Sequence, residues 1–251
     1  MTLGVVGKGG VGKTTFTGLI ARAYVSRGAR VVAIDTDSNP NLGMSLGLSL
    51  AETEAVPVLP RSVLVGDGGS TTADRLVADY GRVTPAGPTL LSAIKVTEAG
   101  AGCTCGGHAT VRGMLADALA DVDVTLVDME AGLEHLSRSG GTLAYADALL
   151  IVCEPTRKSV LTATRTAALA AELGIPATLA VGNKTRSDAD REFFESAFAA
   201  GGLRLAAILP YNAELAEADR TGSVVLAEVP TSVQAAVDAV VDAVESVRQP
   251  A

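Results

Sequence analysis

Short aliphatic runs alternate along this chain with longer stretches of helical character. The runs predict strands at Leu3–Val6, Arg30–Ile34, Thr89–Val96, Val124–Asp128, Ala148–Val152, Ala177–Val181 and Leu205–Leu209. The longer stretches predict helices at Thr15–Ser26, His108–Ala120, Ser159–Leu173, Asp188–Ala199 and Ser232–Val247. Such alternation is typical of βαβ units, so we expect an α/β fold with a mostly parallel sheet covered by helices on both faces.

One stretch, at about residues 50–87, departs from this regularity. It contains the turn-rich segment Gly66-Asp67-Gly68-Gly69-Ser70 and three prolines, Pro57, Pro60 and Pro85. We interpret it as an irregular insertion. Since no linker divides the chain elsewhere, residues 1–251 are expected to form a single domain.

Composition narrows the class of protein. Hydrophobic residues make up 48% of the chain and aromatic residues only 3%, so the core must be built from aliphatic side chains, as suits a parallel sheet. A formal net charge of −8, with no Lys/Arg-rich run, argues against broad affinity for nucleic acid or anionic lipid. We find no signal peptide at the N-terminus and no apolar segment approaching the roughly 20 residues that span a bilayer. Three cysteines do not make a disulfide framework, so we expect a reducing cytoplasm.

The strongest motif follows the first predicted strand and precedes a predicted helix. Gly7-Lys8-Gly9-Gly10-Val11-Gly12-Lys13-Thr14 satisfies G-x-x-x-x-G-K-[ST], the phosphate-binding P-loop, which we take to extend to Thr15. Its backbone N–H groups and the positive end of the following helix attract phosphate oxygens. Lys13 is expected to reach the β- and γ-phosphates, and the Thr14 hydroxyl to bind Mg²⁺. The motif therefore predicts a Mg²⁺-dependent nucleotide hydrolase.

Acidic residues end two further predicted strands. Asp35 and Asp37 follow one aliphatic run, and Asp128 ends another in the manner of a Walker B strand. Because strand C-termini open onto the ligand crevice in such sheets, all three should lie near the nucleotide, although each acid would also suit a helix cap.

Two later segments are candidates for contact with the base. Asn183 and Lys184 follow one strand, and Pro210 and Tyr211 follow the last. A guanine-reading pattern would place Asp two positions after Lys184, where this chain has Arg186, so ATP is favoured. Plain loop structure is the alternative at both places.

Cysteines form the second functional motif. Gly102-Cys103-Thr104-Cys105 lies between a strand and a helix, at the same edge of the sheet as the nucleotide. Thiols at a helix N-terminus have depressed pKa values and serve as soft metal ligands. Two thiolates do not complete a tetrahedral site, but Cys103 and Cys105 from each of two chains would supply four sulfurs. Zn²⁺, Ni²⁺ and Cu(I) all accept thiolate ligands, so the motif does not name the ion. Two filler cysteines in a loop are the alternative.

These motifs together resemble a known family. Lys8 near the start of the P-loop marks the deviant Walker A group, which includes Min-type, partition-type and nitrogenase-iron-protein-type ATPases. Over nearly its whole length the chain resembles the CooC family, accessory ATPases of carbon monoxide dehydrogenase maturation. The residues that carry this likeness are Lys8, Gly102-Cys103-Thr104-Cys105 and Asp128-Met129-Glu130-Ala131-Gly132-Leu133-Glu134-His135-Leu136.

The resemblance implies roles for several residues. Lys8 would reach across a homodimer to the partner's phosphates, and Asp37 would orient the attacking water. Asp35 would support Mg²⁺ and the P-loop, Asp128 would hold Mg²⁺ through water, and the Gly132 N–H would sense the γ-phosphate. The implied function is ATP-dependent nickel insertion into a client metalloenzyme, a carbon monoxide dehydrogenase.

Some residues fit the resemblance less closely. Family members often have Pro directly after the second switch aspartate, whereas Ser38 and Asn39 intervene here before Pro40. Glu130, Glu134 and His135 could belong to a switch region or bind metal; the alternative is that they are surface polar residues. We interpret His108 as a helix-start residue and Cys153 as a buried small hydrophobic residue.

Other functions remain open at this point. A Min- or partition-type positioning ATPase is the main alternative, although the acidic final helix is unsuited to anionic lipid. An iron–sulfur electron-transfer protein would need a switch cysteine where Ala131 stands. A slowly hydrolysing nucleotide-dependent scaffold is the third.

Overall fold

Parallel strands form the centre of the molecule, as the aliphatic runs predict. The computed structural model describes residues 1–251 apart from 61–71, 96–104, 117–120, 132–141, 222–228 and 249–251. The strands are β1 (Thr2–Gly7), β2 (Val31–Asp35), β3 (Arg82–Val83), β4 (Thr89–Ser92), β5 (Val124–Asp128), β6 (Ala148–Cys153), β7 (Ala177–Thr185) and β8 (Arg204–Pro210). They make one eight-stranded sheet in the order β3-β4-β2-β5-β1-β6-β7-β8. Only the short β3 is antiparallel to its neighbour; the other pairs are parallel.

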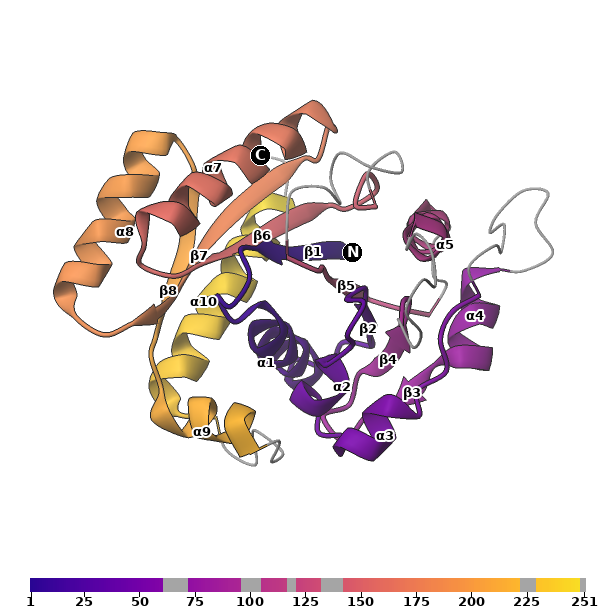
Figure 1. Cartoon of the computed structure of the whole chain (residues 1–251). Coiled ribbons are helices and arrows are strands. Elements are labelled where there is room, and N and C mark those ends of the chain that lie inside the picture. The colour runs from indigo at the N-terminus through magenta and orange to yellow at the C-terminus, as the bar shows by residue number, and fades with distance from the viewer. Residues whose placement is uncertain (61–71, 96–104, 117–120, 132–141, 222–228, 249–251) are drawn as a thin grey trace.

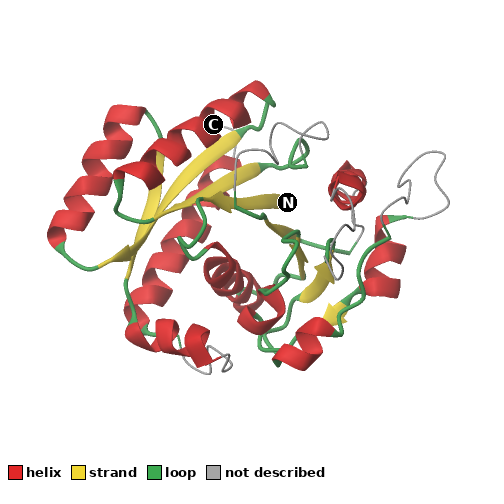
Figure 2. Ribbon diagram, in the orientation of Figure 1, coloured by secondary structure: helices red, strands yellow, loops and turns green. Residues whose placement is uncertain are grey.

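Helices cover both faces of this sheet (Figures 1 and 2). They are α1 (Lys13–Ser26), α2 (Leu42–Ser45), α3 (Leu50–Glu54), α4 (Ala73–Tyr80), α5 (Cys105–Ala116), α7 (Arg157–Glu172), α8 (Asp188–Gly201), α9 (Ala213–Thr221) and α10 (Thr231–Arg248). Helices α1 and α10 pack on one face, and α4, α5, α7 and α8 pack on the other. The predicted α/β class is confirmed.

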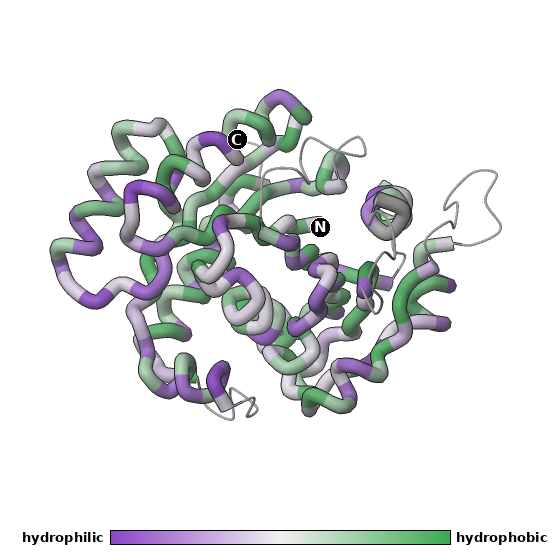
Figure 3. Tube along the Cα trace, in the orientation of Figure 1, coloured by the Kyte–Doolittle hydropathy of each residue, from purple (hydrophilic) through white to green (hydrophobic). Residues whose placement is uncertain are grey.

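Two hydrophobic cores result, one on each face. Successive residues of β2 show the division: Val31 and Ala33 join the core beneath α1 and α10, whereas Val32 and Ile34 join the core beneath α5, α7 and α8. Alternation of this kind follows from the two-residue period of a strand. Because both faces are covered, the whole strand is buried and reads as a continuous aliphatic run, which is also visible as the apolar colouring of the central strands in Figure 3.

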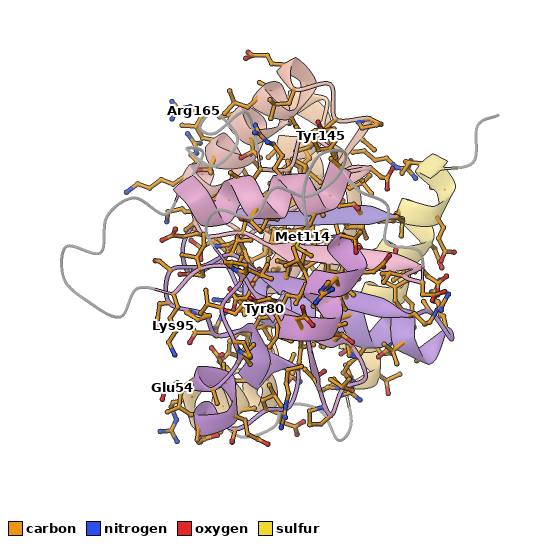
Figure 4. All side chains as sticks on the ribbon, turned by 90° about the vertical axis from the view of Figure 1, so that its right-hand side faces the viewer. Glu54, Tyr80, Lys95, Met114, Tyr145 and Arg165 are labelled. Carbon is orange, nitrogen blue, oxygen red and sulfur yellow. The ribbon has the colours of Figure 1, made fainter. Side chains whose placement is uncertain are left out.

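The predicted irregular insertion contains α3, α4 and β3. A Ser49–Glu52 capping box begins α3, and the Lys95 ammonium donates to the carbonyl oxygen of Glu54 at its end (2.8 Å; both residues are labelled in Figure 4). Short β3 pairs with β4 at the edge of the sheet. The turn-rich segment 66–70 lies outside the described residues.

Within the described residues, three boundaries differ by three residues or more from the prediction. Strand β7 runs to Thr185 and not to Val181, so Asn183 and Lys184 lie at its end and not after it.

The other two boundaries are near the cysteine motif. Strand β4 ends at Ser92 and not at Val96, since its partner β2 ends at Asp35, whose carbonyl accepts the last bond, from the Ala93 N–H. Helix α5 begins at Cys105 and not near His108, although Gly106 and Gly107 are poor helix formers. Burial of Val111 and Met114 against the sheet supplies the packing that outweighs this propensity.

Among the described residues, no helix is both long and apolar enough to cross a membrane.

Gly18 in the middle of α1 tests the packing of this helix. A Cβ there would lie 2.8 Å from the carbonyl oxygen of Ser45 in α2. Gly18→Ala gains about 1 kcal/mol of helix propensity, but overpacking costs about 1–3 kcal/mol. We expect a lower free energy of unfolding, measured with urea, by about 1 kcal/mol or more. In the control, Gly201→Ala, the new methyl meets Thr164 Oγ1 at 3.7 Å, an ordinary contact, and stability should not fall. Equal stability of Gly18→Ala and the wild type would contradict the close α1–α2 approach.

Candidate nucleotide site

The P-loop connects β1 to α1 at the centre of the sheet, between β5 and β6. Two glycines show why the loop tolerates few side chains. A Cβ on Gly7 would lie 2.4 Å from the carbonyl oxygen of Val152 on β6. Gly12 adopts a left-handed conformation (φ 91°), and a Cβ there would lie 2.7 Å from Asn183 Nδ2. The loop backbone therefore approaches its neighbours as closely as glycine alone allows.

The N-terminus of α1 opens into a cavity of about 600 Å³. Gly12 is the N-cap, and because it has no side chain it supplies no capping hydrogen bond to the first turn. The first turn also carries no acidic residue, so the positive end of the helix faces the cavity without a compensating carboxylate of its own. The predicted phosphate residues that line the cavity are Gly9, Gly10, Gly12, Lys13, Thr14 and Thr15. This is the geometry of an anion site.

Asp128 lies beneath the first turns of α1. Its carboxylate accepts hydrogen bonds from the hydroxyls of Thr14 and Thr17, the latter at 3.1 Å. Residues 14 and 17 are three apart on a helix and so share a face. The P-loop motif identified Thr14 but missed Thr17. The available signal was that Thr17 lies three residues after Thr14, which places both on one face of the helix that follows the P-loop.

Asp35 and Asp37 occupy different positions. Asp37 lines the cavity, as expected. Asp35 is 2% exposed, and its carboxylate accepts hydrogen bonds from the backbone N–H groups of Asp37, Asn41 and Leu42 (2.9–3.0 Å). Asp35 therefore shapes the loop that follows β2, and its proposed support of Mg²⁺ is indirect through that loop.

The buried carboxylates have perturbed pKa values. Desolvation, with the neighbouring charge of Asp128, raises the pKa of Asp35 to about 7. Desolvation also raises the pKa of Asp128 to about 6, against the lowering effect of hydrogen bonds from Thr14 and Thr17 and of the Lys13 charge. Burial lowers the pKa of Lys13, opposed by Asp128, Asp37 and Glu130. Negative charge is thus concentrated beside one buried ammonium group.

This oxygen-rich environment fits Mg²⁺. The Thr14 hydroxyl and the Asp128 and Asp37 carboxylates are hard oxygen ligands of the kind that Mg²⁺ prefers, directly or through water. Bound Mg²⁺ would neutralise the charge that develops on phosphate oxygens. The chain's own groups would supply the rest: loop N–H groups and Lys13 would hold phosphates, and Asp37 lines the cavity where a water would be oriented.

The segments predicted to contact the base border the same cavity. Asn183 Nδ2 donates to the Val11 carbonyl (2.8 Å), and Lys184 Nζ donates to the Gly10 carbonyl (2.6 Å). Both residues therefore brace the P-loop. Lys184 has φ 59°, the one positive φ among described residues other than glycine.

Pro210 and Tyr211 line the same cavity next to the end of β7, where the Tyr211 N–H donates to the Thr185 carbonyl. Arg186 stacks on Tyr211, with its guanidinium carbon 3.7 Å from the ring centroid, a cation–π contact. Apolar residues missed by sequence reasoning, Leu209, Leu215 and Val233, complete this end, and their separation along the chain explains why no motif signals them.

Lys8, like Gly7 and Val11, is a predicted phosphate-site residue that does not line the cavity. Its side chain is 42% exposed, and its ammonium lies 3.8 Å from the carboxylate of Glu154, just after β6. Gly132 lies outside the described residues, but Ala131 before it lines the cavity.

The cysteine motif is described only in part. Cys103 lies outside the described residues, and Cys105 is the first residue of α5. His108, one turn further, is buried, with Nδ1 3.2 Å from the Thr142 hydroxyl. Cys153 is 1% exposed, and burial raises the pKa of its thiol to about 12. Within the described part of the chain no three acidic, histidine or cysteine side chains form a metal cluster. Glu134 and His135 lie outside the described residues.

The buried pair of Asp35 and Asp128 makes stability depend on pH. Because the folded protein binds a proton on each carboxyl more tightly than the unfolded chain does, protonation of these two groups contributes to the free energy of unfolding. This contribution is fully present below about pH 4 and is lost as pH rises through about 6 and 7. Asp128→Asn removes one charge, so its stability relative to the wild type, without nucleotide, should be greater at pH 8 than at pH 5. We expect a difference on the order of 2 kcal/mol by urea unfolding. The exposed Asp188→Asn is the control; an Asp128→Asn effect independent of pH would contradict the assignment.

Comparisons with known proteins agree with this geometry. A family model, described as the CobQ/CobB/MinD/ParA nucleotide binding domain, matches residues 5–225. The chain is 35% identical over 237 residues to the carbon monoxide dehydrogenase accessory protein CooC of Rhodospirillum rubrum, covering 88% of each protein. It is 31% identical over 240 residues to an uncharacterized ATP-binding protein of Methanocaldococcus jannaschii, covering 88% of this chain and 90% of the other.

Solved structures share the fold. The septum site-determining protein MinD of Pyrococcus horikoshii, in complex with Mg-ADP, superposes with a TM-score of 0.72 at 20% identity, covering 99% of this chain and 98% of that one. The predicted P-loop ATPase class is therefore confirmed by both sequence and structure comparison. The chain belongs to the CobQ/CobB/MinD/ParA family of P-loop ATPases, and within it is a homologue of CooC.

Proposed function

We propose that this protein is a dimerising ATPase that delivers a metal ion, nickel in the first instance, to a carbon monoxide dehydrogenase-like client enzyme. The observation that carries the proposal is the position of Cys105 as the first residue of α5. The chain continues from α5 into β5, whose last residue is Asp128 in the nucleotide site. A metal held by Cys103 and Cys105 is thus one helix and one strand away from the phosphate loop. Similarity to CooC over 88% of both chains supports this reading.

Dimerisation would complete both sites. Lys8 does not line its own cavity, and its ammonium lies 3.8 Å from the partly exposed carboxylate of Glu154. Exposed pairs of this kind contribute at most about 1 kcal/mol, so Lys8 exchanges Glu154 for a partner subunit's triphosphate at little cost. Two subunits brought together in this way would contribute four thiolates, enough for a tetrahedral ion.

Hydrolysis would reverse the assembly. Water oriented by Asp37 attacks the γ-phosphorus, and loss of that phosphate removes its contact with Lys8 of the partner chain and with the Gly132 N–H. The dimer then loosens and the metal passes to the client. Thiolates persist only where thiols are kept reduced, so we place this cycle in the cytoplasm.

A positioning ATPase of the Min type is the second candidate, favoured by the fold shared with MinD. The final helix α10 argues against attachment to an anionic membrane. Its Asp238, Asp242 and Glu245 face Arg27 of α1, with Arg27–Asp242 the shortest contact at 2.9 Å. These acidic side chains remain 42–68% exposed, so this side of α10 presents negative charge, whereas a membrane-surface helix presents a basic face.

Metal titration tests the shared thiolate site. We expect Ni²⁺ or Zn²⁺ to bind at one ion per two chains, measured by calorimetry with metal analysis after gel filtration, and to be lost in Cys103→Ser/Cys105→Ser. Cys153→Ala is the matched control: with a thiol pKa of about 12, Cys153 remains protonated at neutral pH, so its removal should leave binding unchanged. Stoichiometric metal in the double variant would refute the site.

Mass in solution tests the role of Lys8. With Mg²⁺ and a non-hydrolysable ATP analogue, light scattering should register a doubling from the 25.3 kDa chain. Lys8→Ala should bind the analogue yet remain a single chain, whereas the exposed Lys158→Ala control should dimerise normally. A wild-type protein that stays monomeric under these conditions excludes the dimer mechanism.

A further inference from the structure

Ser38 and Glu130 join the two loops that carry the acidic residues of the site. The Ser38 hydroxyl donates to Glu130 Oε1 at 3.0 Å. Ser38 directly follows Asp37, and Glu130 comes two residues after Asp128. Neither residue has a role in the mechanism so far.

This hydrogen bond extends the pairing of β2 and β5 beyond the ends of both strands. Their parallel register ends at Asp35 opposite Asp128. Past that point, the N–H and hydroxyl of Thr36 both donate to the Asp128 carbonyl, at 3.0 and 2.8 Å. The Ser38–Glu130 bond then follows, so the loops remain joined for three residues after the strand ends.

Asp37 lies between these two connections. Its N–H donates to Asp35, and its own carboxylate accepts from the N–H of Asn39, which fixes the local turn. The position of the whole turn relative to the P-loop depends on what ties it to β5. Thr36 ties the side of the turn before Asp37, and Ser38 ties the side after it.

Glu130 is also close to the phosphate-binding lysine. Burial lowers the pKa of Lys13, and the charges of Asp128, Asp37 and Glu130 oppose that effect. The Glu130 carboxylate is therefore within electrostatic range of the Lys13 ammonium, and its hydrogen bond to Ser38 places the Asp37 turn beside the same group.

We propose that Ser38 and Glu130 are positioning residues for ATP hydrolysis: their hydrogen bond holds the Asp37 turn where its carboxylate orients water. In that reaction the water oxygen bonds to the γ-phosphorus, the bond to the β,γ-bridging oxygen breaks, and the water proton leaves to solvent. The inference rests on the proposed role of Asp37 but not on metal delivery.

Steady-state hydrolysis by the full-length protein with Mg²⁺ and no added metal cargo tests the proposal. Ser38→Ala and Glu130→Ala should each lower kcat by about 10-fold or more, as expected for loss of a hydrogen bond to a charged group. The Kd for a non-hydrolysable ATP analogue should stay within about twofold, because neither residue is proposed to hold phosphate. Ser38→Thr keeps the hydroxyl and should retain most of the wild-type kcat. The double variant should be no slower than the worse single variant, since both remove the same bond.

Ser49 supplies a matched control from outside the site. Its hydroxyl donates to Glu52 at 2.8 Å in the capping box of α3, the same pair of groups. Ser49→Ala should lower stability in urea but leave kcat unchanged. Unchanged kcat in folded Ser38→Ala and Glu130→Ala, fully additive losses in the double variant, or an equal loss in Ser49→Ala would each overturn the proposal. A wild-type protein that does not hydrolyse ATP would instead remove the proposed function itself.

Discussion

The uncapped N-terminus of α1 is the constraint on which the rest of the site depends. Gly12 ends the P-loop in a left-handed conformation and leaves the first helical N–H groups to the cavity. A helix end with open N–H groups is costly unless water or an anion meets them. The surrounding elements are arranged so that an anion can do so. Strand β6 approaches Gly7 too closely for a side chain, and Asn183 and Lys184 of the next strand, β7, donate to the loop carbonyls. The conformation of the P-loop therefore depends on contacts with neighbouring strands more than on side chains of the loop itself.

The buried charges of the site balance one another less well in the empty protein than they would with nucleotide and Mg²⁺ bound. Asp35 and Asp128 are both buried, and each carries a pKa well above its usual value. One ammonium group, Lys13, offsets them only in part while it is itself desolvated. A cation beside Asp128 relieves this repulsion, and phosphates give Lys13 a second partner. Nucleotide and Mg²⁺ binding therefore stabilise each other through the same buried charges.

The same acidic residues at the ends of β2 and β5 also set the positions of the loops that follow these strands. The Asp35 carboxylate accepts hydrogen bonds from backbone N–H groups of the loop that contains Asp37. The conformation of this loop therefore depends on a residue that does not itself line the cavity. The loops after β2 and β5 stay joined by Thr36 and by Ser38 with Glu130. On the far side of β5, helix α5 begins at Cys105 and leads back into the strand that ends at Asp128. The proposed coupling between nucleotide and thiols depends on this connection.

The sequence by itself determined the architecture and the phosphate site, because both depend on local patterns. Aliphatic runs define strands buried on both faces, and the glycines and Lys13 of the P-loop fall at a strand–helix junction that needs no distant partner. Tertiary structure alone decided which acid faces the cavity and which shapes a loop, since Asp35 and Asp37 are equivalent by pattern and differ only in what surrounds them. It also decided that α5 begins at Cys105 despite two glycines, because packing of Val111 and Met114 outweighs propensity. Three further contacts join residues far apart in the sequence, by up to 146 positions: Thr17 with Asp128, Lys8 with Glu154, and Ser38 with Glu130. No spacing rule along the chain predicts pairings over such distances.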